Sequence, residues 1–200
     1  CVDEKGEVID GDAILGICAK NMKEEGMLKN DTLVGTIMSN LGLKEFCENN
    51  DMNFVETKVG DRYVLENMLE NDYNIGGEQS GHVIFLDYST TGDGELTAVQ
   101  ILNILSSSNF SASKLNSMVK KYPQKSATVN IELSQKGLLE KNIEIQKYLK
   151  ETKEKLGSKA KLVVRESGTE PKIRVMAECD DNEFLENLVN KTVEIIKNNL

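Results

Sequence analysis

Segments typical of strands alternate with amphipathic helical segments through the first half of this 200-residue chain. After Asp10, Ile14 and Cys18 recur at helical spacing, and the next apolar run, residues 32–38, has the length and composition of a strand. Such alternation favours a largely parallel sheet with helices packed on it, because each parallel crossover needs a long connection. We therefore predict a mixed, layered α/β domain over residues 1–108.

The expected elements of this domain follow from apolar periodicity and from the positions of glycine, serine and asparagine. They are a hairpin over 2–9, helices beginning near residues 10, 39 (with Ser39 as N-cap), 60 and 94, strands over 32–38, 54–57 and 83–86, and a glycine-bearing loop over 76–82.

The order of elements changes after the serine-rich stretch 106–109, which we interpret as a linker. Residues 1–110 carry 20 acidic and 7 basic residues, whereas residues 111–200 carry 13 and 17, so the sign of the net charge changes here. Such a contrast between halves suggests two domains. For residues 109–200 we predict a small α+β domain with helices on one face of an antiparallel sheet. Its expected elements are a short helix at 113–119, a strand at 128–133, a long helix at 138–155, strands at 162–165 and 172–177, and a last helix over 184–196.

Composition excludes several classes of protein. Apolar residues make up 39% and charged residues 28% of the chain, as in ordinary globular domains. The net charge of −9 argues against a nucleic-acid partner, and no apolar run is long enough to span a membrane. Four scattered cysteines and one histidine fit no zinc site and suit a reducing, cytoplasmic location. Because the chain starts without Met or a signal peptide, we expect it to be part of a longer protein.

The only histidine closes a glycine-bearing loop, Gly76–His82. Glycines allow a positive φ and a close backbone approach to a ligand. A carboxylate such as Glu78 can accept hydrogen bonds from two sugar hydroxyls, and the imidazole of His82 can move a proton near neutral pH. The alternative is a hairpin loop whose histidine only bonds backbone. We favour a substrate-binding loop of Glu78, Ser80 and Gly81, with His82 as a proton shuttle.

A second motif, Arg165–Pro171 followed by Arg174, predicts an anion site between two strands. A tight turn exposes consecutive backbone N–H groups, Ser167 and Thr169 add hydroxyls around Gly168, and arginine offers a planar fork suited to phosphate. The two glutamates of the motif would oppose phosphate unless they point away. The alternative is an ordinary turn with solvated charges.

Two shorter motifs each allow a functional and a structural interpretation. The segment 57–62 is a third candidate motif, and its structural interpretation makes Asp61 a helix cap and Arg62 a solvated helix charge. Asp10 and Asp12 flank a glycine, which could suggest magnesium. Carboxylates at a helix start are more often caps, and no third acid follows at metal-loop spacing, so we predict no metal site in this chain.

Together these motifs resemble the α-D-phosphohexomutase superfamily, and within it the phosphoglucosamine mutases of bacteria. The resemblance runs from about residue 2 to residue 198 and rests on the segments 59–64, 76–82, 91–94 and 165–174. It implies that the chain holds the third and fourth of four domains, namely a sugar-binding α/β domain at 1–108 and a phosphate-binding α+β domain at 109–200.

The resemblance also implies the chemistry of an isomerase. Enzymes of this kind interconvert glucosamine 6-phosphate and glucosamine 1-phosphate through a phosphoserine and a sugar bisphosphate, on the route to UDP-N-acetylglucosamine and peptidoglycan, with magnesium bound in the second domain. Glu78 and Ser80 would then bind sugar hydroxyls, His82 would stand beside them, and Arg62 would be the basic residue near the substrate. The phosphate that is not transferred would be held by Arg165, Ser167, Gly168 and Thr169, with Arg174 beyond them.

The chain departs from this family in lacking its serine nucleophile loop and its aspartate-rich metal loop. We therefore expect no activity from these 200 residues alone. The implied partners are a phosphosugar, its bisphosphate and the first two domains. Two alternatives remain, a phosphomannomutase or phosphoglucomutase of the same superfamily and a non-catalytic sugar-phosphate-binding module.

Overall fold

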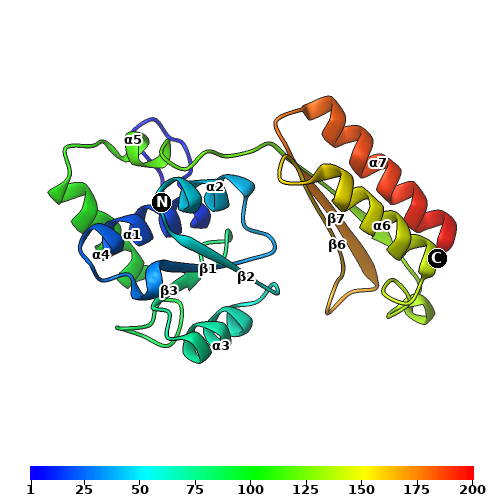
Figure 1. Ribbon diagram of the computed structural model, residues 1–200, viewed down its shortest axis with the longest axis horizontal. Coiled ribbons are helices and arrows are strands. Elements are labelled where there is room, and N and C mark those ends of the chain that lie inside the picture. The colour runs from blue at the N-terminus through cyan, green and yellow to red at the C-terminus, as the bar shows by residue number, and fades with distance from the viewer. The chain divides into compact units, whose positions relative to one another are not determined.

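The computed structural model describes residues 1–200 and contains two compact units, Cys1–Lys121 and Tyr122–Leu200 (Figure 1). Each unit has a sheet and an apolar core of its own. None of the helices has both the length and the apolar character that crossing a membrane requires.

The first unit is built on a four-stranded sheet of order β2-β1-β3-β4. β1 (Thr32–Thr36) is central and runs parallel to β2 (Asn53–Thr57) and β3 (Ile75–Gly77), whereas β4 (Val83–Phe85) is antiparallel to β3. Every residue of β1 is buried, as expected for a strand covered on both faces. The predicted mixed α/β architecture is therefore confirmed.

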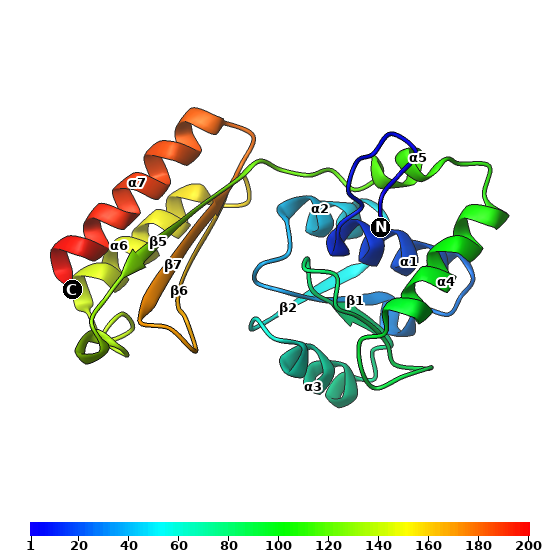
Figure 2. The same cartoon turned by 180° about the vertical axis from the view of Figure 1, so that it is seen from behind.

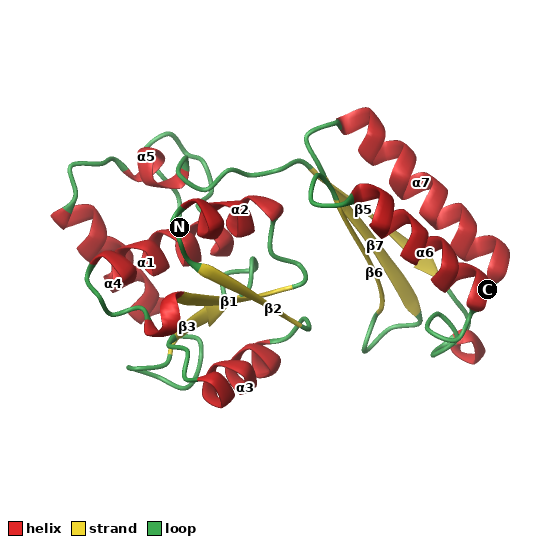
Figure 3. Ribbon diagram, in the orientation of Figure 1, coloured by secondary structure: helices red, strands yellow, loops and turns green.

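Helices cover both faces of this sheet (Figure 3). α1 (Gly11–Glu24), α2 (Leu41–Asn49) and α4 (Gly94–Ser107) pack together on one face, and α3 (Asp61–Asn71) lies on the other. The result is a three-layer sandwich.

Two apolar cores fill the spaces between these layers. Leu33 of β1 belongs to the core under α1, α2 and α4, while its neighbour Val34 packs with Val64 and Met68 of α3. Successive side chains of a strand point to opposite faces, so one strand can serve both cores.

The starts of α1 and α2 follow capping rules, with one correction. Asp10 caps α1 as expected, and its carboxylate accepts from the N–H of Ala13 at 3.1 Å. Asn40, not Ser39, caps α2. The hydroxyl of Ser39 instead accepts from the N–H of Thr36, which closes the turn after β1.

The first unit extends to Lys121, past the boundary predicted at 108/109. α5 (Ala112–Asn116) returns to this unit, where Leu115 and Val119 join the core beneath α1. Serine content suggested a linker at 106–109, but burial of these apolar side chains holds the following segment in place.

The charge contrast between the two parts is smaller with this boundary. The first unit has 20 acidic and 10 basic residues, a net charge of −10, and the second has 13 and 14, a net charge of +1. The basic residues that had made the second half positive include three at the end of the first unit.

The second unit is a three-stranded antiparallel sheet of order β5-β7-β6 with two helices on one face (Figure 2). This agrees with the predicted α+β domain. Its elements are β5 (Gln124–Asn130), α6 (Ile143–Leu156), β6 (Lys161–Glu166), β7 (Lys172–Glu178) and α7 (Asn182–Asn199).

The helix predicted from residue 138 begins later, at Ile143. Asn142 caps it by accepting from the N–H of Ile145 at 3.1 Å. The preceding residues form a turn at Gly137, whose φ of +84° does not continue a helix. The first strand also lies earlier than the predicted 128–133, so the segment between strand and helix is a structured loop.

We predict that Gly42→Ala destabilises the first unit. A Cβ at Gly42 would lie 1.6 Å from the backbone oxygen of Lys120, so α2 or the 112–121 segment must move. We expect a loss of about 1–3 kcal/mol of unfolding free energy, the usual cost of overpacking. Urea unfolding with hydrogen exchange would assign the loss to the first unit. Gly94→Ala, where a Cβ meets nothing within 4 Å, is the control; equal stability of the two variants would contradict the prediction.

Candidate functional site

The loop between β3 and β4 forms the first candidate site. The predicted loop is shortened because its first residues form β3, which pairs with β4 through Gly77 and Val83. The N–H of Glu78 donates to the backbone oxygen of His82 at 3.0 Å, and the N–H of Gly81 donates to that of Glu78 at 2.9 Å. Gly81 adopts a φ of +100°, which explains the glycine at this place.

This loop lies against the start of α1. The N–H of Gly11 donates to the backbone oxygen of Gln79 at 3.0 Å, and a Cβ on Gly11 would come within 2.1 Å of the backbone oxygen of Glu78. The glycine between the two aspartates of this motif therefore serves a close backbone contact.

Two motifs that are separate in sequence meet at this loop. The N–H of Gly60 donates to Oε1 of Glu78 at 3.0 Å, and Nε2 of His82 lies 3.5 Å from Oδ2 of Asp61. The start of α3 thus contacts both titratable side chains of the loop. The other predicted loop residues, Ser80 and Gly81, are exposed.

Arg62 follows Asp61 but interacts elsewhere. Its side chain is 81% exposed, and its Nε donates to Oε1 of Glu66 one turn along α3 at 2.7 Å. The hydrogen bond and charge of Glu66 raise the pKa of the Arg62 guanidinium. The structure therefore brings Asp61, and not Arg62, into contact with the loop.

Gly92, which lies in the segment 91–94 of the resemblance, contacts His82 although no site role was predicted for it. A Cβ on Gly92 would lie 2.5 Å from Cε1 and Nε2 of His82, so the imidazole occupies the place of a side chain there. The next residue, Asp93, caps α4 and accepts from the N–H groups of Glu95 and Leu96. A glycine directly before a helix cap is the only sequence signal for this contact.

The second candidate site is the turn between β6 and β7 in the second unit. Arg165 and Arg174 lie opposite each other in this antiparallel ladder, so their side chains project from the same face. Ser167 is buried; its N–H donates to the backbone oxygen of Lys172 at 2.8 Å. The tip residues Gly168 and Thr169 are exposed. The predicted phosphate-binding residues therefore share one turn.

The two glutamates of this turn behave differently. Glu166 accepts from the N–H of Gly137 at 2.8 Å and from that of Leu139 at 3.2 Å, so it is used by the loop before α6. Glu170 accepts from Nζ of Lys172 at 2.6 Å and from Nη2 of Arg174 at 3.3 Å.

These contacts decide the electrostatics of the turn. The hydrogen bond and positive charge of Lys172, with a further contribution from Arg174, lower the pKa of Glu170. The carboxylate of Glu170 is thus an internal counter-ion for Lys172 and Arg174.

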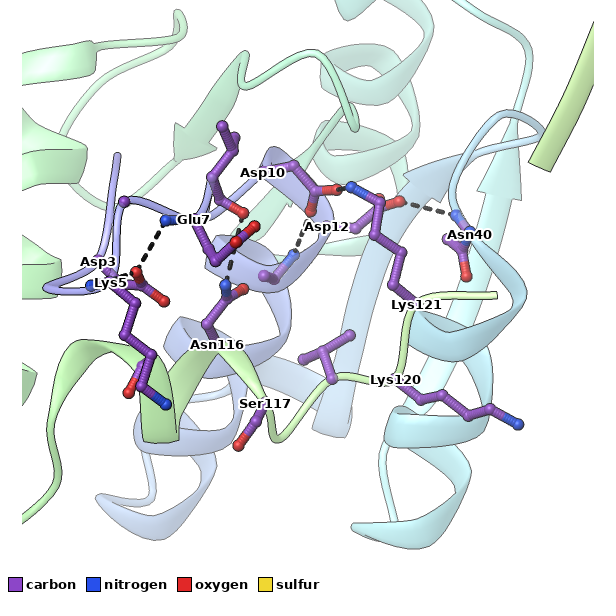
Figure 4. Close-up of a pocket in the computed structure, with 15 residues that line it drawn as sticks. Asp3, Lys5, Glu7, Asp10, Asp12, Asn40, Asn116, Ser117, Lys120 and Lys121 are labelled. Carbon is purple, nitrogen blue, oxygen red and sulfur yellow. Dashed lines mark hydrogen bonds and ion pairs between the residues drawn. The ribbon is translucent and has the colours of Figure 1, made fainter. Parts of the chain in front are cut away.

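A cavity of about 570 Å³ lies elsewhere in the first unit, between the N-terminal hairpin and the 112–121 segment (Figure 4). It is lined by none of the predicted site residues. Nζ of Lys121 is 2.5 Å from Oδ2 of Asp10, Oδ2 of Asp12 accepts from the N–H of Asn40 at 2.7 Å, and Asp3 accepts from two backbone N–H groups. These carboxylates therefore contact a lysine and backbone N–H groups of the first unit. The structure contains no group of three or more His, Cys, Asp or Glu side chains that could bind a metal ion.

Comparison with protein families identifies the two units. Residues 10–122 match the family described as phosphoglucomutase/phosphomannomutase, alpha/beta/alpha domain III, and residues 129–195 match its C-terminal domain. The chain belongs to this family. The first match ends beside the structural boundary at Lys121.

The chain is also similar to curated phosphoglucosamine mutases. It is 47% identical to that of Anoxybacillus flavithermus over 98% of this chain and 43% of the relative, and 44% identical to that of Bacillus subtilis over 100% and 44%. The chain therefore spans less than half the length of these relatives and corresponds to their C-terminal domains. The predicted resemblance is confirmed.

Solved structures share the fold at low identity. The Aspergillus fumigatus N-acetylphosphoglucosamine mutase, in complex with GlcNAc-6P and magnesium, matches with a TM-score of 0.81 and 16% identity, over 98% of this chain and 48% of the other. A phosphoglucomutase/phosphomannomutase family protein from Burkholderia thailandensis matches with a TM-score of 0.76 and 18% identity, over 98% and 43%.

We predict that Glu170→Gln destabilises the second unit at neutral pH and not in acid. The folded pKa of Glu170 is lowered, so its contribution to stability is present above the unfolded value of about 4.3 and is lost as the pH falls through the folded value. Urea unfolding of both proteins from pH 7 downward would show the difference closing. The control is Glu140→Gln, an exposed glutamate of the same unit. A difference that persists at low pH would contradict the prediction.

Proposed function

We propose that the chain supplies the sugar-binding and phosphate-binding domains of a phosphoglucosamine mutase, which interconverts glucosamine 6-phosphate and glucosamine 1-phosphate. The observation that carries the proposal is the meeting of Glu78 and His82 with the start of α3 at one exposed loop. The names of the curated relatives favour glucosamine over mannose or glucose as the sugar.

In the first unit, the carboxylate of Glu78 accepts hydrogen bonds from hydroxyl groups of the sugar. Its Oε1 is engaged by the N–H of Gly60, which fixes the carboxylate and leaves Oε2 to accept from a substrate hydroxyl. Ser80 adds an exposed hydroxyl, and Gly81 keeps the loop tip free of a side chain that would crowd the sugar. His82 moves a proton to and from a reacting hydroxyl.

In the second unit, the turn holds the phosphate that is not being transferred. Arg165 and Arg174 supply charge, and Ser167, Gly168 and Thr169 supply hydroxyl and backbone donors. A bound dianion takes the place of Glu170 opposite Arg174, because both anions are attracted to the same cations. This exchange keeps a counter-ion beside Arg174 when no phosphate is bound.

The phosphoryl-transfer groups lie in the remaining domains. Asp10 and Asp12 do not fit a magnesium site, since their carboxylates are engaged by Lys121 and by backbone N–H groups of Ala13 and Asn40. We therefore assign the magnesium and the phosphoserine of the family to the part of the enzyme that precedes these residues. Covalent phosphoryl transfer needs such a nucleophile and a charge-stabilising metal.

Turnover of glucosamine 6-phosphate by the chain joined to its further domains tests this function. We expect conversion to glucosamine 1-phosphate, and a fall of roughly 10- to 1,000-fold in kcat/KM for Glu78→Ala, because a hydrogen bond between a substrate hydroxyl and a charged group is lost. The control is Glu70→Ala, which removes an exposed carboxylate near the other end of α3. The 200-residue chain alone is the negative control, for which we expect no turnover. Equal activity of both variants, or faster turnover of mannose or glucose phosphates, would refute the proposal.

We also predict that Arg165→Ala raises KM in the same enzyme by roughly 10-fold or more, because it removes a charge-assisted contact to phosphate. Lys197→Ala removes one positive charge from the last turn of α7 and is the matched control. Titration of phosphosugar by calorimetry measures the two affinities. Equal losses would mean that bulk charge, and not the turn, binds the phosphate.

A further inference from the structure

The two carboxylate oxygens of Asp61 have separate contacts. Oδ1 accepts from the N–H of Arg62 at 2.8 Å, inside the first turn of α3. Oδ2 lies 3.5 Å from Nε2 of His82. One side chain therefore connects the start of α3 to the only histidine of the chain.

The imidazole of His82 is confined on two sides. Gly92 lies against the ring, close enough that a Cβ there would be 2.5 Å from Nε2. Nε2 itself is buried and forms no hydrogen bond within the chain. The only ion pair that includes His82 is the one between Nε2 and the Asp61 carboxylate. About a third of the side chain remains exposed. The ring thus turns its Nε2 edge inward, while part of the side chain stays accessible.

We propose that Asp61 is a positioning residue that holds the neutral His82 ring with its proton on Nε2, which leaves Nδ1 as the proton acceptor toward the substrate. The inference rests on the proposed function, in which His82 moves a proton. The negative charge of the Asp61 carboxylate, 3.5 Å from Nε2, favours the tautomer whose N–H is directed toward it. Asp61 needs no contact with the sugar for this role.

The same geometry stabilises the charged state during transfer. When a substrate O–H bond breaks and an Nδ1–H bond forms, the imidazole becomes an imidazolium. Its positive charge then faces the negative charge of Asp61 across 3.5 Å. The proton on Nδ1 is later returned to a sugar oxygen, so the ring ends in its starting tautomer.

An asparagine at this position separates the positioning role from the contact of Asp61 with the backbone of α3. Asp61→Asn keeps an oxygen that can accept from the N–H of Arg62, so the start of α3 is preserved. Its amide NH₂ can donate to Nε2, which would favour the opposite tautomer with the proton on Nδ1. The matched control is Glu144→Gln, which neutralises an exposed carboxylate in the first turn of α6.

Nitrogen NMR reads the tautomer directly because the chain has one histidine. With ¹⁵N-histidine labelling, long-range ¹H–¹⁵N correlation at about pH 9, above the usual histidine range, distinguishes protonated from unprotonated ring nitrogens. We expect the proton on Nε2 in the unaltered chain and in Glu144→Gln, and a rise of the Nδ1–H form in Asp61→Asn. Identical spectra for all three would overturn the inference.

Kinetics of the chain joined to its further domains test the consequence. We expect Asp61→Asn to lower kcat by roughly 10-fold or more with a smaller change in KM, and Asp61→Glu to restore part of kcat. A changed tautomer with unchanged kcat would overturn the positioning role while the mutase assignment stands. Absence of mutase activity in the unaltered enzyme would instead refute the proposed function, and the NMR result would still decide whether Asp61 sets the tautomer.

Discussion

The site in the first unit depends on a backbone contact between the start of α1 and the β3–β4 loop. The N–H of Gly11 donates to the backbone oxygen of Gln79 at 3.0 Å, and the backbone oxygen of Glu78 lies 2.1 Å from where a Cβ of Gly11 would be. Because backbone meets backbone there, the position of the loop is set by the packing of the sandwich. From that position Glu78 and His82 contact the start of α3.

In the second unit, the main electrostatic constraint is the pairing of two arginines in the β6–β7 ladder. An antiparallel ladder that places Arg165 opposite Arg174 brings like charges together on one face, which is unfavourable when nothing compensates them. Glu170 provides that compensation through its contacts with Lys172 and Arg174. A phosphate dianion would provide more of it, so the proposed ligand and the internal carboxylate compete for one place. The proposed function therefore predicts that anion binding and stability of the turn are coupled.

Local patterns predicted most elements but missed where several of them begin or end. Periodicity and capping located α1 and α3 and both architectures, because these depend on residues close together in the chain. The boundary expected at 108/109 was wrong, since serine content says nothing of Leu115 and Val119, whose burial attaches the following segment to the first unit. The start of the helix expected from residue 138 was placed too early for a similar reason, because Glu166 engages the loop before it.

The sequence by itself determined which groups are present for chemistry: a single histidine in a glycine-bearing loop, and a turn with arginines, hydroxyls and glutamates between two strands. Only the tertiary structure decided which atoms meet. Asp61, and not Arg62, faces His82, and Gly92 makes room for its ring. These contacts join residues far apart in the chain. They depend on how α3 and α4 pack on the sheet, which no local spacing of residue types specifies.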